Sequence, residues 1–337
     1  MEPVARRRLG RSAVEVSRMG FGGAPLGNLF NPVPADAARQ AIDAAYDRGL
    51  RYFDTAPLYG HGLSERRLGD ALRSRPRESF VLSTKVGRVL EPGTPAAGAY
   101  VEVPALVPRF DYSEAGALRS LEESLGRLGL DRVDVLYIHD IDGFTHGADS
   151  APARFREAMA GAYRTIERLR REGRVRAIGI GVNEWEACQR AAEAADFDCF
   201  LLAGRYTLLE QEAVESFLPL CERRGIGVVI GGPLNSGILA TGPVSGATYN
   251  YRPAPPPILE RAGRLERVCA SHGVPLAAAA LQFPLAHPAV ACVIPGARSE
   301  AEVELNVALL ARPLPTALWR DLKAEGLLHA DAPTPAV

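Results

Sequence analysis

The chain has 337 residues, of which 47% are hydrophobic and 23% are charged. This composition is typical of a globular protein with a large core, and the length suits one barrel with insertions, so we expect residues 1–337 to form a single domain. The formal net charge is −1 and the basic run Arg6-Arg7-Arg8 is short, which argues against a nucleic-acid partner.

The first predicted element is a β-hairpin, in which residues 6–9 and 14–17 flank the turn Gly10-Arg11-Ser12. Strand and helix patterns then alternate to the end of the chain. Apolar runs predict strands that begin near Met19, Arg51, Phe80, Val133, Val175, Cys199, Ile226 and Val290. Helical patterns cover residues 34–48, 63–73, 114–128, 158–172, 184–195, 211–224, 258–272, 277–286 and 300–310.

Eight strand–helix units therefore follow the hairpin. The strands are continuously apolar, as in a parallel sheet that is covered on both faces. This repetition predicts a (β/α)8 TIM barrel of the α/β class, with an active site at the C-terminal ends of the strands. The alternative is a doubly wound sheet, which calls for a GxGxxG motif after the first strand. The stretch FGGAP at residues 21–25 does not supply one.

Three long segments follow strand ends: residues 87–112, 140–156 and 234–257. In a barrel they hang from the C-terminal face, and loops of this length are usually functional. The alternative is that they are disordered surface loops. The aromatic residues of the first and third segments are candidates for substrate contact, and the alternative is that their rings pack loop to barrel. These residues are Phe110, Tyr112, Tyr249 and Tyr251.

Four titratable residues mark the predicted strand ends. Asp54, Lys85 and His139 each end a strand, and Tyr59 follows the second strand. A Lys–Asp pair would satisfy two of them, and a nearby positive charge lowers the pKa of a phenol. We expect Tyr59 to act as a general acid or base and His139 to orient the reacting oxygen. This set suits proton transfer at a carbonyl or alcohol oxygen, coupled to hydride transfer at carbon.

The five cysteines are scattered and show no CxxC spacing. We expect free thiols in a reducing compartment and no metal site. The N-terminus lacks the apolar segment of a signal peptide, and no apolar run reaches 18 residues. These patterns predict a cytoplasmic protein without a membrane partner.

The stretch DTAPLYG at residues 54–60, the pair TK that ends on Lys85 and the stretch YIHD around His139 resemble the aldo-keto reductase superfamily. The resemblance extends over nearly the whole chain, including the N-terminal hairpin. It implies that Tyr59 is the acid/base, that Lys85 and Asp54 tune it, and that His139 orients the substrate. It also implies a nicotinamide cofactor, NAD or NADP, extended across the top of the barrel.

The cofactor residues follow the same resemblance with departures. Asn183 resembles the asparagine that binds the cofactor carboxamide. Gly204-Arg205-Tyr206 stands where the family has a glutamine, and Gly231 stands where it has a stacking aromatic ring. The other residues that we expect at the cofactor are Gly22, Gly232, Pro233, Leu234, Ser236, Gly237, Gly296, Arg298, Glu302 and Asn306.

The choice between NAD and NADP depends on the segment after the last strand. Gly296 and Glu302 occupy positions where NADPH-preferring members place lysine and arginine, and Arg298 is the remaining cation. A carboxylate at Glu302 can accept a hydrogen bond from a ribose hydroxyl but repels a phosphate. We expect a modest preference for NAD, with both cofactors still open.

Three further stretches resemble a sugar-oxidising branch of the superfamily: LLAGRYTLLEQ (201–211), GGPLNSGILATG (231–242) and ATYNY (247–251). This branch comprises D-threo-aldose 1-dehydrogenases, also called L-fucose dehydrogenases, with L-galactose dehydrogenase and pyridoxal 4-dehydrogenase as relatives. The resemblance implies oxidation of the C1 hydroxyl of an aldose such as L-fucose, D-arabinose or L-galactose to a lactone. The alternatives are pyridoxal oxidation, broad aldehyde or ketone reduction, and a catalytically idle barrel that binds nucleotide. The oligomeric state is left open.

Overall fold

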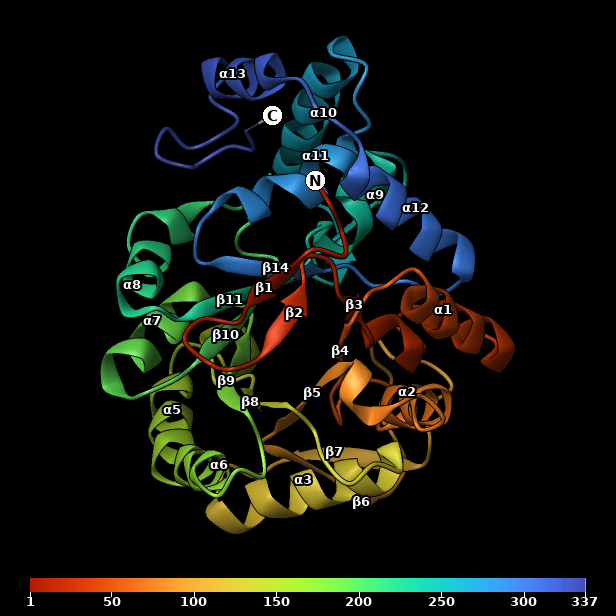
Figure 1. Ribbon diagram of the computed structural model, residues 1–337, viewed down its shortest axis with the longest axis vertical. Coiled ribbons are helices and arrows are strands. Elements are labelled where there is room, and N and C mark those ends of the chain that lie inside the picture. The colour runs from red at the N-terminus through yellow and green to blue at the C-terminus, as the bar shows by residue number, and fades with distance from the viewer. Residues whose placement is uncertain (337) are drawn as a thin grey trace.

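Eight parallel strands form one sheet in a computed structural model that describes residues 1–336 (Figure 1). Their order in the sheet is β14-β11-β10-β9-β8-β5-β4-β3. Each strand of this sheet therefore pairs with the strand of the unit before it and the strand of the unit after it in the chain. Their bounds are β3 (Phe21–Gly22), β4 (Tyr52–Asp54), β5 (Val81–Val86), β8 (Val135–His139), β9 (Ala177–Val182), β10 (Cys199–Ala203), β11 (Gly227–Gly231) and β14 (Val290–Ile294).

The two ends of the sheet meet and close it into a barrel. Parallel bridges join Met19 to Val293 and Gly22 to Gly296. A side chain cannot replace the hydrogen of Gly22, because a Cβ there would lie 2.8 Å from the carbonyl oxygen of Ile294. The predicted (β/α)8 barrel is confirmed, and its closing strand β3 is only two residues long.

The predicted N-terminal hairpin is also confirmed. Strands β1 (Arg6–Arg8) and β2 (Glu15–Ser17) pair antiparallel, and Figure 1 shows them crossing one end of the barrel. Leu9, Val14 and Val16 are fully buried and join the inner core of the barrel. The hairpin thus closes the N-terminal end of the barrel with apolar side chains.

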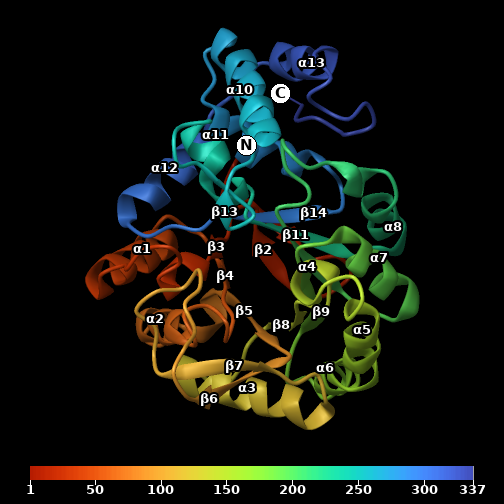
Figure 2. The same ribbon diagram turned by 180° about the vertical axis from the view of Figure 1, so that it is seen from behind.

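Helices surround the sheet (Figures 1 and 2). Local signals bound some of them: α3 begins at a Ser113 cap that accepts the N–H of Gly116 and ends at Gly129 in the left-handed conformation. The helices between strands are α1 (Ala35–Asp47), α2 (Leu63–Leu72), α3 (Glu114–Leu128), α5 (Ala151–Ala160), α6 (Ala162–Arg171), α7 (Trp185–Ala194), α8 (Phe217–Arg224), α10 (Pro256–Ser271) and α11 (Leu276–Gln282); α12 (Glu300–Ala311) and α13 (Thr316–Ala324) follow β14.

The long segments after the strands contain regular structure, contrary to the disordered alternative. The first holds the antiparallel pair β6 (Arg88–Pro92) and β7 (Leu106–Phe110). The second holds α4 (Gly143–His146) and the start of α5. The third holds α9 (Ile238–Thr241), β12 (Thr248–Tyr249) and β13 (Arg252–Pro253). Figure 2, seen from behind, shows α4, β6–β7 and β13 on the face opposite the hairpin.

Several predicted boundaries are wrong. The helix expected over residues 158–172 is two helices, because the chain breaks at Gly161, where a Cβ would lie 2.4 Å from the carbonyl oxygen of Tyr112. The helix expected over residues 211–224 is a short 3-10 turn, η3 (Glu212–Val214), followed by α8. Helix α13 was not expected. Lys85 is the penultimate residue of β5 rather than its last.

Among residues 1–336, no single helix combines the length and the hydropathy that a membrane span requires. Helix α10 together with residues 276–286 meets that test only as a pair, which is bent by 100°.

Candidate active site

The alternation of side chains along the strands places three polar groups inside the barrel. Successive residues of a strand point to opposite faces. The side chains of one buried cluster, the inner core, fill the inside of the barrel. Asp54, Lys85 and His139 each follow a member of this cluster on the same strand by two or four residues. All three therefore point inward, at the C-terminal end of the barrel. The inner-core residues two or four positions earlier are Tyr52, Val81 and Tyr137.

Asp54 and Lys85 form a buried ion pair. Nζ of Lys85 donates to Oδ2 of Asp54 at 2.7 Å and to the carbonyl oxygen of Thr55 at 2.8 Å. The hydroxyl of Ser83 donates to the other Asp54 oxygen at 2.7 Å. Burial raises the pKa of Asp54 and lowers the pKa of Lys85, while their mutual attraction opposes both shifts. The pair is therefore strongly coupled, and each charge depends on the other.

Tyr59 lies beside this pair. Nζ of Lys85 is 4.6 Å from the centre of the Tyr59 ring. Burial, followed by the negative charge of Asp54, nevertheless raises the pKa of Tyr59 well above its usual range. The predicted lowering is therefore wrong for this structure, because desolvation dominates and the charge of Lys85 is already paired. Tyr59 is a neutral phenol here.

His139 completes the predicted set of four. Its ring meets the Tyr59 ring edge to face, with the ring centres 5.9 Å apart. Burial, and then the charges of Arg88 and Lys85, lowers the pKa of His139 well below its usual value. The imidazole is therefore neutral near physiological pH and can donate a hydrogen bond without carrying charge.

Sequence reasoning missed three residues beside Tyr59 and His139, at the C-terminal end of the barrel, which we call the opening. Arg88 and Asp140 form a second buried ion pair, with 2.7 Å between Nη2 and Oδ2, and Asp140 follows His139 directly. Tyr100, in the β6–β7 hairpin, lies with its ring centre 6.3 Å from that of Tyr59. The motif YIHD already contains Asp140, so its place beside the histidine was a usable signal, whereas nothing in the local sequence marks Tyr100.

The structure places Phe110 and Tyr112 behind the opening. Tyr112 is fully buried, and its hydroxyl lies 2.9 Å from the carbonyl oxygen of His139 and 2.6 Å from that of Asp140. Phe110 stacks on Tyr112 and lies under the guanidinium of Arg88, 4.4 Å from its ring centre. These rings pack against the strand end and do not line the opening. This arrangement matches the alternative in which the aromatic rings pack loop to barrel.

The two tyrosines of the β12–β13 hairpin differ from each other. Asn250 and Tyr251 form its turn, both with positive φ. Tyr251 is 43% exposed; burial of its phenol raises its pKa, and the nearby side chain of Asn183 opposes that rise. Tyr249 packs against the main hydrophobic core. The hairpin thus brings Tyr251, but not Tyr249, to the opening.

The turn after β11 carries several of the predicted cofactor residues. Gly231 ends the strand, Gly232 and Gly237 have positive φ, and no atom lies within 4 Å of the place that a Gly237 Cβ would take. Pro233 is buried and Leu234 packs against the core. This turn leaves backbone exposed at the C-terminal face, as the approach of a pyrophosphate requires.

The remaining cofactor candidates lie at the neighbouring strand ends. Arg205 donates to the side chain of Asn250 at 3.0 Å, and Ser236 accepts the backbone N–H of Tyr251 at 3.1 Å. Tyr206 does not face this side, because it is fully buried against the ring of Phe283.

The segment after β14 begins at Gly296, which pairs with Gly22 across the barrel seam. The guanidinium of Arg298 donates to Glu302 at 2.7 Å, and the backbone N–H of Arg298 donates to the same carboxylate at 2.8 Å. This hydrogen bond raises the pKa of Arg298. Asn306 is buried on α12.

These residues fit an extended dinucleotide. Asn183, Ser236, Gly237 and Arg298 follow β9, β11 and β14 and so lie along one edge of the C-terminal face. Oδ1 of Asn235, in the same turn, is buried and accepts no hydrogen bond from residues 1–336. An unpaired buried acceptor of this kind fits a site that a polar ligand completes.

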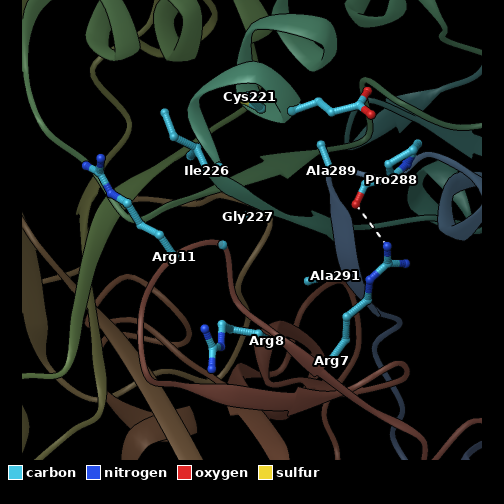
Figure 3. A pocket seen from close by; sticks show the side chains of 12 residues that line it. Arg7, Arg8, Arg11, Cys221, Ile226, Gly227, Pro288, Ala289 and Ala291 are labelled. Carbon is cyan, nitrogen blue, oxygen red and sulfur yellow. Dashed lines mark hydrogen bonds between the residues drawn. The ribbon is translucent and has the colours of Figure 1, made fainter.

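A separate hollow of about 240 Å³ lies at the opposite end of the barrel. Figure 3 shows Arg7, Arg8 and Arg11 of the hairpin around it. Arg7 donates to the carbonyl oxygen of Pro288 at 3.1 Å, and Arg11 pairs with Asp196. Two of the three arginines around the hollow thus already have partners in the chain, and the hollow is remote from the four predicted catalytic residues.

The five cysteines are free and buried, as predicted for the thiols. Burial raises the pKa of the thiols, so none is an activated nucleophile. Within residues 1–336, no three His, Cys, Asp or Glu side chains lie close enough together to hold a metal ion.

Comparison with known proteins finds relatives along almost the entire chain. The sequence profile of the Aldo/keto reductase family matches residues 18–325. Pyridoxal 4-dehydrogenase of Microbacterium luteolum is 41% identical and covers 96% of this chain and 98% of its own. D-threo-aldose 1-dehydrogenase of a Pseudomonas species is 40% identical, covering 96% and 97%. L-galactose dehydrogenase of Arabidopsis thaliana is 30% identical, covering 91% and 88%.

Solved structures agree with these sequence relatives. The holo form of the aldo-keto reductase AKR11C1 from Bacillus halodurans superposes with a TM-score of 0.73 at 28% identity, covering 97% of each chain. Glycerol dehydrogenase AKR11B4 of Gluconobacter oxydans, at 23% identity and the same TM-score, shares the fold. The inward polar cluster, the closed barrel and the length of the sequence match lead to one conclusion. The chain belongs to the aldo/keto reductase family and is an NAD(P)-dependent oxidoreductase.

Proposed function

We propose that this enzyme oxidises the C1 hydroxyl of an aldose of the L-fucose, D-arabinose or L-galactose type to the corresponding lactone. The observation that carries the proposal is the placement of Tyr59 over the buried Asp54–Lys85 pair, with neutral His139 edge-on to it. The sugar substrate is supported by two relatives, which are named D-threo-aldose and L-galactose dehydrogenases.

The chain's own residues divide the reaction as follows. His139, held neutral, donates a hydrogen bond to the C1 oxygen and fixes its position. Tyr59 accepts the proton of that hydroxyl, while the C1–H bond breaks and its electron pair leaves as hydride. NAD(P)+, when bound, would accept the hydride. Lys85 stabilises the phenolate that Tyr59 must form before it can act as a base.

Pyridoxal oxidation is the second candidate. The relative at 41% identity is named pyridoxal 4-dehydrogenase, and the opening carries the rings of Tyr59, Tyr100 and Tyr251. Flat aromatic faces suit stacking on a pyridine ring as well as on the CH surface of a sugar.

A substrate panel separates these activities. The wild-type enzyme is assayed with L-fucose, D-arabinose, L-galactose and pyridoxal, each with NAD+ and NADP+, and with a simple aldehyde in the reducing direction. We expect the highest kcat/KM with one of the sugars. Preference for pyridoxal would select the second candidate, and absence of turnover with every compound would support an idle nucleotide-binding barrel.

We further propose a modest preference for NAD+ and expect Glu302→Arg to shift it toward NADP+. The substitution removes the carboxylate that now holds Arg298 and adds a second guanidinium near the expected 2′-phosphate. A direct guanidinium–phosphate contact is worth roughly 1–3 kcal/mol, so the ratio of kcat/KM values for the two cofactors should move by roughly 5- to 150-fold.

The matched control for this experiment is Glu304→Arg. Glu304 lies on the same helix and pairs with Arg48 on the surface, so it changes the net charge equally without touching the cofactor segment. A wild-type enzyme that favours NADP+ tenfold or more, with a ratio that Glu302→Arg leaves unmoved, would show that this segment does not meet the adenine ribose.

Tyr251→Ala is expected to raise KM for the sugar more than it lowers kcat. Tyr251 lies near Asn183, a predicted cofactor residue, and loss of one hydrogen bond to substrate costs about 0.5–1.5 kcal/mol, or roughly 2- to 10-fold in KM. Tyr251→Phe separates the hydroxyl from the ring. Tyr249→Ala is the comparison, and because that ring packs on the core, it should lower thermal stability instead. Unchanged kinetics in Tyr251→Ala would remove this residue from the site.

A further inference from the structure

The ion pair between Arg88 and Asp140 is buried but incompletely satisfied. Arg88 is 5% exposed and Asp140 is 7% exposed. Nη2 of Arg88 donates to Oδ2 of Asp140 at 2.7 Å. Oδ1 of Asp140 accepts no hydrogen bond from residues 1–336, and Nη1 of Arg88 is buried without an acceptor. The buried donor is costly to leave without a partner, whereas Oδ1 of Asp140 is not fully buried and stays accessible to accept a hydrogen bond.

The backbone at Asp140 is fixed from several sides. Its φ is 51°, a left-handed conformation that few residues other than glycine, asparagine and aspartate adopt. Its N–H donates to the carbonyl oxygen of Gly181 at 2.9 Å. Its own carbonyl oxygen lies 2.6 Å from the hydroxyl of Tyr112 and 2.9 Å from Nε2 of His146. Strained residues held in this way concentrate at functional sites, and here the consequence is a carboxylate of fixed position.

That position is beside the reacting atoms. Oδ2 of Asp140 is 3.5 Å from Nε2 of His139, the residue that we place on the reacting oxygen. The pKa values of Tyr59, Tyr100 and Tyr251 are raised mainly by burial, and the negative charge of Asp140 adds to each rise. Because Asp140 and His139 are adjacent, a hydroxyl on the carbon next to an oxygen that contacts His139 would be within reach of Asp140.

We propose that Asp140, held by Arg88, binds the hydroxyl on the carbon next to the one that is oxidised. A hydroxyl is the group that fits, because a carboxylate oxygen without a partner accepts a hydrogen bond and needs a donor. An alkyl or aldehyde substituent offers no donor. This inference rests on the proposed sugar oxidation and adds to it the residues that distinguish a polyhydroxylated substrate from a simple one.

The test compares two sugars that differ in that hydroxyl alone. D-arabinose carries a C2 hydroxyl, and 2-deoxy-D-ribose is the same sugar without it. Asp140→Asn is the variant. Arg88 donates to Oδ2 of Asp140, so the amide of the asparagine should keep its oxygen at that place. Its NH2 group then takes the place of Oδ1, and a hydrogen-bond donor replaces the acceptor. We expect kcat/KM for D-arabinose to fall roughly 10- to 100-fold, and the value for 2-deoxy-D-ribose to fall at most about threefold.

Two further variants complete the design. Arg88→Lys keeps the positive charge but removes the forked donor, and it should show the same selective loss for D-arabinose. Thermal unfolding reports whether Asp140→Asn folds. If it does not fold, Arg88→Lys takes its place in the comparison of the two sugars. Glu91→Gln is the matched control, since Glu91 is an exposed carboxylate on the same hairpin, 3.6 Å from Arg109. It should keep wild-type kinetics with both sugars.

The possible outcomes separate this inference from the proposed function. An equal loss of kcat/KM with both sugars in Asp140→Asn would overturn the inference alone, because a residue that merely positions His139 affects every substrate equally. Equal kcat/KM of the wild-type enzyme with D-arabinose and 2-deoxy-D-ribose would also overturn it. Failure of the wild-type enzyme to oxidise any sugar of the panel, with pyridoxal turned over, would overturn the proposed function and this inference with it.

Discussion

Replacing Tyr59 by phenylalanine is expected to lower kcat by about 10²- to 10⁴-fold, the usual contribution of a general acid or base. The substitution removes the hydroxyl that exchanges a proton with the substrate. It keeps the ring that lies 4.6 Å from the ammonium of Lys85 and edge-on to His139, so the fold and the Kd for the cofactor should be unchanged. The measurements are steady-state turnover and fluorescence titration with the cofactor. Oxidation at the wild-type rate would refute the assigned role.

The same assignment gives the sign of the pH dependence. Burial raises the pKa of Tyr59, and oxidation of an alcohol requires the deprotonated form. The rate of oxidation should therefore rise with pH on the alkaline side, whereas reduction of an aldehyde, which uses the protonated phenol, should fall there. Both slopes should disappear in Tyr59→Phe. His139 contributes no slope near neutral pH, because its pKa is depressed by burial.

Lys85→Met is expected to reduce both activity and stability. The change leaves the carboxylate of Asp54 buried with only the Ser83 hydroxyl as a partner, and breaking a buried pair by removing one member costs about 3–5 kcal/mol. The negative charge that is left beneath Tyr59 also opposes phenolate formation. We expect the midpoint of chemical denaturation to fall and turnover to be lost.

A double variant separates the two effects. In Asp54→Asn/Lys85→Met no charge is left unpaired, and the amide can still accept the hydrogen bond from Ser83. Much of the lost free energy of unfolding should therefore return, while the activity should not, because no cation lies near Tyr59. A single variant, Lys85→Met, that is as stable as the wild type would show that the pair is not ionic in the folded protein.

The barrel and the catalytic set could be predicted because they depend on local patterns. Continuous apolar strands of about five residues, separated by helical patterns, admit few folds. The period of two along a strand then fixes which polar residues point inward, which is why Asp54, Lys85 and His139 meet in the structure. These inferences use spacing along the chain and need no knowledge of the loops.

Features that depend on contacts between distant segments could not be predicted. The pKa of Tyr59 is raised, whereas the sequence predicted that it is lowered, because the effect of burial outweighs that of the neighbouring lysine. The β6–β7 hairpin was hidden by Pro92 and Pro108, which weaken a strand pattern. Tyr100 reaches the opening because that hairpin folds over it, and no periodicity in the local sequence indicates this.

The seam between β3 and β14 has a consequence for how the protein is made. Met19 and Gly22 pair with Val293 and Gly296. Strand β3 is the first barrel strand to leave the ribosome, and it can pair with β14 only after β14, the last strand, has been synthesised. Until then, the N-terminal hairpin and β3 present apolar side chains and an unpaired edge, the surfaces from which aggregation begins. Contacts of such high sequence separation also form slowly. Closure of this seam should therefore be a late event in folding, and slow protection of the Gly20 and Gly22 amides against hydrogen exchange would report it.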